Sequence, residues 1–190
     1  MSVNAIALAD HRARRRRDVV DNATELLVRG GPAAVTPAAV ATATGLASHS
    51  VSRFFETTDE LIAAAVEELF IRDLTSITLS INAAGTNPVA QLEAYVRTVI
   101  AAAVKGHLHG NLTAMEVLPP NHQERLMDLH EELNRPLVLI VQRLESTDPE
   151  CDSAMVLGVI SSASQLVLAG EPKEHVVART MKFLRGALSV

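Results

Sequence analysis

Residues 36–55 read TPAAVATATGLASHSVSRFF, a stretch that predicts two short helices joined by a tight turn. Thr36 can cap the first helix through its hydroxyl, and Pro37 suits the first helical position because its missing N–H would have no partner there. Gly45 then supplies the turn, since glycine adopts backbone conformations that other residues avoid. The stretch therefore predicts a helix-turn-helix, a motif whose second helix enters the major groove of DNA.

The second helix of this motif is expected to have two different faces. Val51, Phe54 and Phe55 recur at i, i+3, i+4 spacing and therefore predict a buried face. The opposite face carries small polar side chains, which can form hydrogen bonds to base edges in a major groove. An exposed helix position without a base contact is the alternative for His49. We expect the major groove to be met by Ser48, His49, Ser50 and Ser52, with Arg53 at its edge or on a phosphate.

Four consecutive arginines lie upstream of the motif. Residues 1–55 contain seven arginines against four acidic residues, a net charge of +3, so the remainder of the chain carries −8. Positive charge is thus concentrated where DNA phosphates would be met. We expect the cluster to contact phosphates or the minor groove, and a solvated tail is the alternative. The cluster consists of Arg14, Arg15, Arg16 and Arg17, while Thr36 and Thr58 are expected near backbone oxygens of the DNA.

A series of residues between positions 16 and 62 matches one family pattern in order and without a gap. The matching residues are Arg16, Val19, Val20, Ala23, Glu25, Leu26, Leu27, Gly31, Thr36, Val40, Ala41, Gly45, Leu46, Arg53, Phe54, Phe55, Asp59, Glu60 and Leu61. With them the chain resembles the amino-terminal DNA-binding domain of the TetR family of bacterial transcriptional regulators. The resemblance implies a three-helix DNA-binding domain followed by a helical domain that binds an effector and dimerises.

Three positions depart from the family pattern. The family usually carries a tyrosine where this chain has Ser52, a serine at Ala47 and a phosphate-contacting lysine at Thr58. These departures affect the anchoring to the DNA backbone rather than the fold. They keep an alternative open, namely a small-molecule-binding or interaction protein of the same fold with weakened or lost DNA binding.

The rest of the chain predicts further helices, because apolar residues recur with a 3.6-residue period and only 3% of residues are aromatic. Thr57 or Thr58 followed by Asp59 and Glu60 is a helix-start signal, with a hydroxyl cap and an acidic first turn. Pro136 falls inside a predicted helix and should kink it. The predicted helices cover about 59–80, 88–105, a short segment ending near 118, 120–144, 149–170 and 172–188.

The last two predicted helices are apolar over most of their circumference. Between 149 and 170, apolar residues cover more than one face, so we expect this helix to be buried on two sides. One side can be the core of the domain itself, and the other requires a partner subunit. The resemblance implies a homodimer with a four-helix bundle across a two-fold axis, which matches palindromic DNA. The alternative is the ordinary core of a compact monomer.

The effector can be predicted only as a chemical class. Beyond residue 55 the aromatic residues are Phe70, Tyr95 and Phe183. A largely apolar, aliphatic or acyl-like ligand therefore fits better than a flat polyaromatic dye, which would need stacking partners. The candidates for lining the site are Met115, Met155 and Gln165, for which plain core packing is the alternative.

Motifs of other functional classes are missing from the sequence. It contains no Gly-x-Ser-x-Gly elbow, Walker loop or dinucleotide fingerprint, so neither enzyme activity nor a cofactor is expected. No two histidines have i, i+4 spacing, and His107 and His109 are only two apart, so no metal site is expected. The single Cys151 excludes an intrachain disulfide. The longest apolar runs fall short of the roughly 20 residues of a membrane span, so we expect a cytoplasmic protein without a membrane partner.

These patterns predict an all-α protein with a flexible basic arm over residues 1–15, a three-helix helix-turn-helix domain over 16–57 and a helical effector-binding and dimerisation domain over 58–190. The expected function is that of a ligand-responsive transcriptional regulator, most often a repressor in families of this kind. It would bind a palindromic double-stranded DNA operator as a homodimer and be released by a small-molecule effector. A regulator that responds to a protein or a metal, or that acts as an activator, is the alternative within DNA binding.

Overall fold

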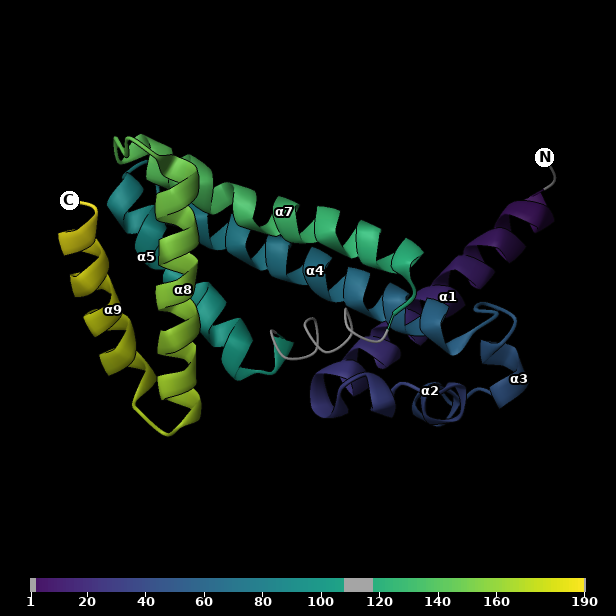
Figure 1. The fold of residues 1–190 in the computed structure, drawn as a ribbon. Coiled ribbons are helices and arrows are strands. Elements are labelled where there is room, and N and C mark those ends of the chain that lie inside the picture. Colours follow the sequence, from purple (N-terminus) through teal and green to yellow (C-terminus); the bar gives the residue numbers. More distant parts are fainter. Residues whose placement is uncertain (1–2, 108–117, 190) are drawn as a thin grey trace. The chain divides into compact units, whose positions relative to one another are not determined.

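The computed structural model describes residues 3–107 and 118–189, and the regular structure within them is entirely helical (Figure 1). This confirms the predicted all-α fold. The short helix predicted to end near residue 118 falls mostly on residues 108–117, outside the described part. The helices are α1 (Val3–Gly30), the 3-10 helix η1 (Pro32–Ala34), α2 (Pro37–Thr44), α3 (Ser48–Val51), α4 (Thr58–Ala83), α5 (Pro88–Val104), α7 (Pro120–Arg143), α8 (Pro149–Leu168) and α9 (Lys173–Ala187).

The described residues form two compact units. The first unit contains residues 3–69 and 118–126, and the second contains Phe70–His107 and residues 127–189. The sequence predicts a division between residues 57 and 58, whereas the structure changes unit in the middle of α4 and of α7. The apolar side of α4 crosses this change of unit, with Phe70 and Ile77 buried and Leu74 half-buried between them, so the sequence pattern does not mark it.

The arm predicted over residues 1–15 is described from Val3 onward as the first turns of α1. No glycine or proline occurs from Val3 to Arg29, and the abundant alanine and arginine favour a helix. The described side chains up to Asp18 are exposed, and the first buried side chain is Val19. Local propensity rather than burial therefore accounts for the helical start of the chain.

The first unit packs α2 and η1 against the buried face of α1. Val19 and Ala23 lie one turn apart on this face and are fully buried. Thr24 follows Ala23 in α1, and its side chain is buried. Its hydroxyl lies 2.9 Å from the carbonyl oxygen of Val20 and 3.1 Å from the carbonyl oxygen of Ala65, so it can donate a hydrogen bond to either oxygen. Thr24 thereby connects α1 to the first half of α4.

The second unit has its own core, in which α5 packs against α8 and α9 (Figure 1). At its centre lies Tyr95, whose side chain is 1% exposed, and burial raises the pKa of its hydroxyl. A stripe of apolar residues along α7 and just beyond it is buried or half-buried. These residues are Leu126 in the first unit and Leu129, Leu133, Leu137, Ile140 and Leu144 in the second.

Helix α8 is the most apolar element of the second unit. It has 20 residues and a mean hydropathy of 1.4, so by length and composition alone it could cross a membrane, which differs from the expectation that no segment reaches that limit. Its Val156, Ile160 and Ala163 are nevertheless packed into the core described above. Only 28% of the apolar window of this helix is buried within the described residues, so this packing covers part of its surface.

Candidate nucleic-acid interface

The segment from α2 to α3 has helix-turn-helix geometry. The Thr36 hydroxyl oxygen accepts a hydrogen bond from the N–H of Ala39 at 3.1 Å and so caps α2 as predicted. Gly45 ends α2 in the left-handed conformation, with φ of 66° and ψ of 24°. The N–H of Leu46 then returns to the carbonyl oxygen of Ala41 at 2.9 Å, as in a Schellman motif. The turn predicted from the sequence is confirmed.

The helix after the turn is shorter than predicted. α3 contains only Ser48–Val51, although the N–H groups of Phe54 and Phe55 both reach the carbonyl oxygen of Val51, at 2.9 and 3.2 Å. Val51 is 1% exposed and Phe55 is 6% exposed, so these two side chains anchor α3 to the unit. Phe54 is half-buried at the edge of this face.

The side chains predicted to face DNA lie at the surface of the first unit. The side chains on the outward face of α3 and in the turn that follows it are polar. Together they form a small patch whose one positive charge belongs to Arg53. Exposed side chains are Thr36, Ser48, His49, Ser52, Arg53 and Thr58, and Ser50 is half-buried.

Thr57, rather than Thr58, caps α4. The Thr57 hydroxyl oxygen accepts a hydrogen bond from the N–H of Glu60 at 3.1 Å, and the Glu60 carboxylate accepts one from the N–H of Glu56 at 2.8 Å. This exchange resembles a capping box and fixes the start of the helix. Thr58 is therefore the first residue of α4, and its exposed hydroxyl is not needed as a cap.

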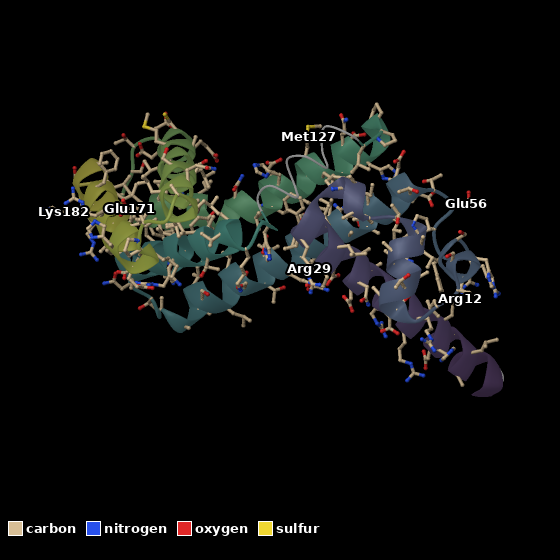
Figure 2. All side chains as sticks on the ribbon, turned by 90° about the horizontal axis from the view of Figure 1, so that it is seen from below. Arg12, Arg29, Glu56, Met127, Glu171 and Lys182 are labelled. Carbon is tan, nitrogen blue, oxygen red and sulfur yellow. The ribbon has the colours of Figure 1, made fainter. Side chains whose placement is uncertain are left out.

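The clustered arginines are exposed along α1, and Arg12 projects from the same helix one turn earlier (Figure 2). Arg16 differs from its neighbours because its guanidinium carbon lies 4.8 Å from the centroid of the Phe55 ring, a cation–π contact. It thereby connects α1 to the end of the helix-turn-helix. No pattern in the sequence indicates this role, since the partner ring is distant in sequence and no spacing rule links the two residues.

A cavity of about 380 Å³ lies among α4, α5 and α7 in the second unit. Arg143 lies at one end, where it donates hydrogen bonds to the side-chain oxygen of Gln91, at 2.6 Å, and to the carbonyl oxygen of Thr86. Pro136 lies within α7, which continues through it, and its missing N–H removes the helical donor for the carbonyl of Glu132. The lining residues are Thr78, Ile81, Asn82, Gln91, Glu132, Arg135, Pro136, Leu139, Ile140 and Arg143.

The residues proposed from the sequence to bind the effector do not gather in this cavity. Met155 is 64% exposed on α8, and Gln165 is exposed on the same helix. Neither residue lines this cavity. Met115 lies outside the described residues. An exposed position on α8 fits a contact with another protein surface better than the lining of an internal cavity.

One histidine of the second unit has a close acidic partner. His107 Nδ1 lies 2.6 Å from Asp73 Oδ1, and both side chains are largely buried between α4 and the end of α5. A metal site would need further ligands, and within the described residues no group of three or more His, Cys, Asp or Glu side chains is placed to hold an ion. His109, considered with His107 in the sequence, lies outside the described residues.

No protein-family model and no curated protein matches the chain. Solved structures do match it. PfmR, a TetR-family transcriptional regulator from Thermus thermophilus, is 17% identical, with coverage of 88% of this chain and 97% of that one and a TM-score of 0.66. AibR, solved with isovaleryl coenzyme A and operator DNA, is 14% identical, with coverage of 89% and 97% and a TM-score of 0.71.

A further match is a protein described as a superantigen. The superantigen PfiT is 16% identical, with coverage of 89% of this chain and 95% of that one and a TM-score of 0.75. Identities this low establish the fold and leave the function to the site. The chain thus has the fold of the TetR-family transcriptional regulators.

Proposed function

We propose that this protein is a ligand-responsive transcriptional regulator of the TetR type. In this proposal it represses transcription in the cytoplasm of a bacterium by binding a palindromic operator as a homodimer. The observation that carries the proposal is the helix-turn-helix itself. A capped α2 and a left-handed Gly45 precede a short helix that is anchored by Val51 and Phe55 and has a polar, exposed outward face.

The DNA contacts follow from this geometry. Ser48, His49, Ser50 and Ser52 are proposed to read base edges, because small polar side chains on an anchored helix can approach a major groove. Arg53, Thr36 and Thr58 are proposed to lie on the phosphate backbone. The exposed arginines of α1 would add phosphate contacts that do not depend on base sequence.

The homodimer is supported by an exposed apolar face on α8 and α9. Met155 is 64% exposed, Leu166 53% and Phe183 62%, and such exposed apolar side chains typically mark an interaction surface when they lie on adjoining elements. A two-fold axis through this face would give each subunit one recognition helix for one half of a palindrome.

The cavity among α4, α5 and α7 is the proposed effector site. Its volume of about 380 Å³ is in the range of small-molecule sites, and Ile81, Leu139 and Ile140 provide an aliphatic lining. Asn82 adds a polar group that could orient a carbonyl or amide. A ligand with an aliphatic acyl group fits this lining, and the isovaleryl coenzyme A bound in the AibR complex carries a branched aliphatic acyl group on a polar, charged carrier.

The direct test is selection of bound sequences from a random double-stranded DNA library by the purified protein. We expect enrichment of a palindrome, with binding that weakens as the salt concentration rises because phosphate contacts release counterions. Ser48→Ala/His49→Ala should lose sequence preference while retaining its helical content. Failure to enrich any sequence at low salt would reject the proposal.

A second candidate function rests on two observations. Ser52 and Thr58 stand where the family usually has a DNA-contacting tyrosine and lysine, and the superantigen PfiT shares the fold. The second candidate is a small-molecule-binding or interaction protein with weakened or lost DNA binding. Under this candidate, a ligand would stabilise the protein in a thermal-shift measurement although no DNA sequence is enriched.

A further inference from the structure

A groove of about 880 Å³ runs between α7 and α8 in the second unit. It differs from the cavity among α4, α5 and α7, because its second wall is α8. The groove and the cavity share only Glu132, Arg135 and Leu139, which lie on the part of α7 between them. On α8 the groove is lined by the side opposite to Met155 and Leu166, so the homodimer contact of the proposed function leaves it open.

The middle of the groove is apolar. Its lining there comes from Val138 and Leu139 of α7 and Leu157 of α8. Leu139 is 52% exposed, and Met127, which lines the groove nearer the start of α7, is 56% exposed (Figure 2). The groove therefore leaves large apolar side chains in water, and a methylene chain laid over them would remove this cost.

Carboxylates lie at both ends of this apolar stretch. Glu150 lies in the first turn of α8, next to the connection from α7. Asp128 and Glu131 lie at the other end of the groove on α7. Glu131 is about three helical turns before the end of α7, which is roughly 16 Å along the helix axis. Two separate anionic positions are therefore joined by an apolar surface.

The groove as a whole carries a negative charge. Its lining includes four carboxylates but only one arginine, Arg135, and none of these five residues forms an ion pair with any other described residue. With His130 neutral, the groove keeps a net charge of about −3 facing solvent. This charge favours a cationic ligand over a neutral or anionic one. The carboxylates belong to Asp128, Glu131, Glu132 and Glu150.

One polar atom at the base of the groove lacks a partner. Ser153 is 3% exposed and lines the groove, and its hydroxyl is the one buried side-chain polar atom of the described residues without a hydrogen bond. Buried polar groups are nearly always paired in complete structures. Ser153 follows Glu150 by one helical turn, so an ammonium group held by Glu150 can also donate an N–H to the Ser153 oxygen.

We propose that the α7–α8 groove is a second ligand site, which binds a long aliphatic diamine. One ammonium group lies between Glu150 and Ser153, the other lies beside Asp128 and Glu131, and the methylene chain covers the apolar middle. The ligand needs two charges because carboxylates lie at both ends, and it needs N–H groups because Ser153 lacks a partner. The site goes beyond the proposed function, since it requires neither DNA, nor the homodimer, nor the effector cavity.

Calorimetric titration with diaminododecane tests the site, because this diamine spans a comparable length when extended. We expect wild-type protein to bind it, and to bind diaminobutane about tenfold more weakly, since the short chain cannot reach both ends or cover the apolar middle. Glu131→Gln/Glu150→Gln should weaken binding of diaminododecane by about tenfold. Glu124→Gln is the matched control, since it removes an exposed carboxylate of α7 outside the groove and should leave binding unchanged.

Two results of this titration would overturn the proposal. One is a wild-type protein that binds neither diamine, or that binds both equally. The other is a Glu131→Gln/Glu150→Gln variant that binds diaminododecane as tightly as the wild type.

A second comparison isolates Ser153. Ser153→Ala removes an unpaired buried hydroxyl, so it should fold at least as stably as the wild type in urea denaturation. It should weaken binding of diaminododecane by about fivefold but leave binding of bis(trimethylammonium)dodecane unchanged, because that dication has no N–H to donate. The absence of a selective loss for the diamine would overturn the contact with Ser153.

Ile81→Trp determines which of the two sites the diamine occupies. Ile81 lines the effector cavity but not the groove, so this variant should bind diaminododecane like the wild type. Loss of diamine binding in Ile81→Trp would assign the diamine to the effector cavity and overturn the groove site, while leaving the proposed regulator intact. Conversely, failure to select an operator would reject the proposed function and leave the groove site standing.

Discussion

At the scale of single residues, Gly45 is the position where the backbone itself requires a particular amino acid. Its φ is 66°, and a Cβ added there would meet no atom within 4 Å, so only the backbone conformation disfavours a side chain. Gly45→Ala should lower the free energy of unfolding by about 1 kcal/mol. Gly45→Asn should lower it less, because asparagine tolerates this conformation better. Urea denaturation measures the free energy of unfolding of both variants. Equal stability of Gly45→Ala and the wild type would contradict the turn geometry.

His49 is the largest side chain that the proposed reading face presents. If it reads a base, His49→Ala should weaken operator binding by about 1–3 kcal/mol and relax the preference at one base pair in each half-site. Ser52→Tyr restores the residue that the family usually has and should tighten binding. A fluorescence-anisotropy titration against the selected operator and its point variants measures these effects. An unchanged preference at every base pair would mean that His49 is an exposed residue without a base contact.

The clustered arginines should fall into two groups. Arg16 contacts the Phe55 ring, so Arg16→Gln should lower the stability of the free protein by about 0.5–1 kcal/mol, the usual size of an exposed cation–π contact. Arg15→Gln should leave stability unchanged but reduce the slope of log affinity against log salt by roughly 0.9 if that arginine contacts a phosphate. Equal effects of the two substitutions in both measurements would reject this division.

The contacts of single residues could be predicted from the sequence only where both partners are close together in the chain. The cap at Thr36 and the turn at Gly45 involve partners three to five positions away, and both were correct. The contacts of Thr24 with Ala65 and of Arg16 with Phe55 join residues far apart in sequence, and no pattern indicated them. The lining of the cavity was missed for the same reason, since it combines single residues from three helices.

At the scale of helices, predicted ends were most accurate where caps are strong. Asn87 accepts hydrogen bonds from the N–H groups of Val89 and Ala90, Asp148 accepts one from Cys151, and a proline follows each cap. The corresponding helices begin at Pro88 and Pro149 as predicted. At the amino terminus, the segment predicted as a flexible basic arm is described from Val3 onward as part of α1, and its alanine and arginine residues favour a helix.

The exposed face of α8 leads to a prediction about assembly. Leu166→Glu should raise the dissociation constant of the homodimer strongly, because it would bury an unpaired charge in the proposed interface. Leu79→Glu is the matched control, since Leu79 is 65% exposed on α4 and lies outside that face. Sedimentation should detect monomers of the first variant and dimers of the second. If both variants dimerise like the wild type, the α8 face is not the interface.

At the scale of the whole molecule, α4 is the element through which effector and operator could influence each other. In the first unit, the carbonyl oxygen of Ala65 in the first half of α4 accepts a hydrogen bond from the Thr24 hydroxyl. In the second unit, Thr78, Ile81 and Asn82 of the second half of α4 line the cavity. A ligand that prefers one position of α4 would change the spacing of two recognition helices. Half-sites one helical turn apart, about 34–36 Å, tolerate little mismatch. Effector binding should therefore weaken operator binding.

Thermodynamic linkage makes this coupling measurable from either side. If the effector lowers operator affinity by some factor, the operator must lower effector affinity by the same factor, with an expected coupling of about 1–3 kcal/mol. An acyl compound identified by thermal shift should be titrated calorimetrically into the dimer with and without operator. Ile81→Trp, which fills the cavity, should abolish ligand binding and leave operator affinity unchanged. Equal ligand dissociation constants in the two titrations would remove the coupling but not the DNA binding, because α4 would then serve only as a support for two independent sites.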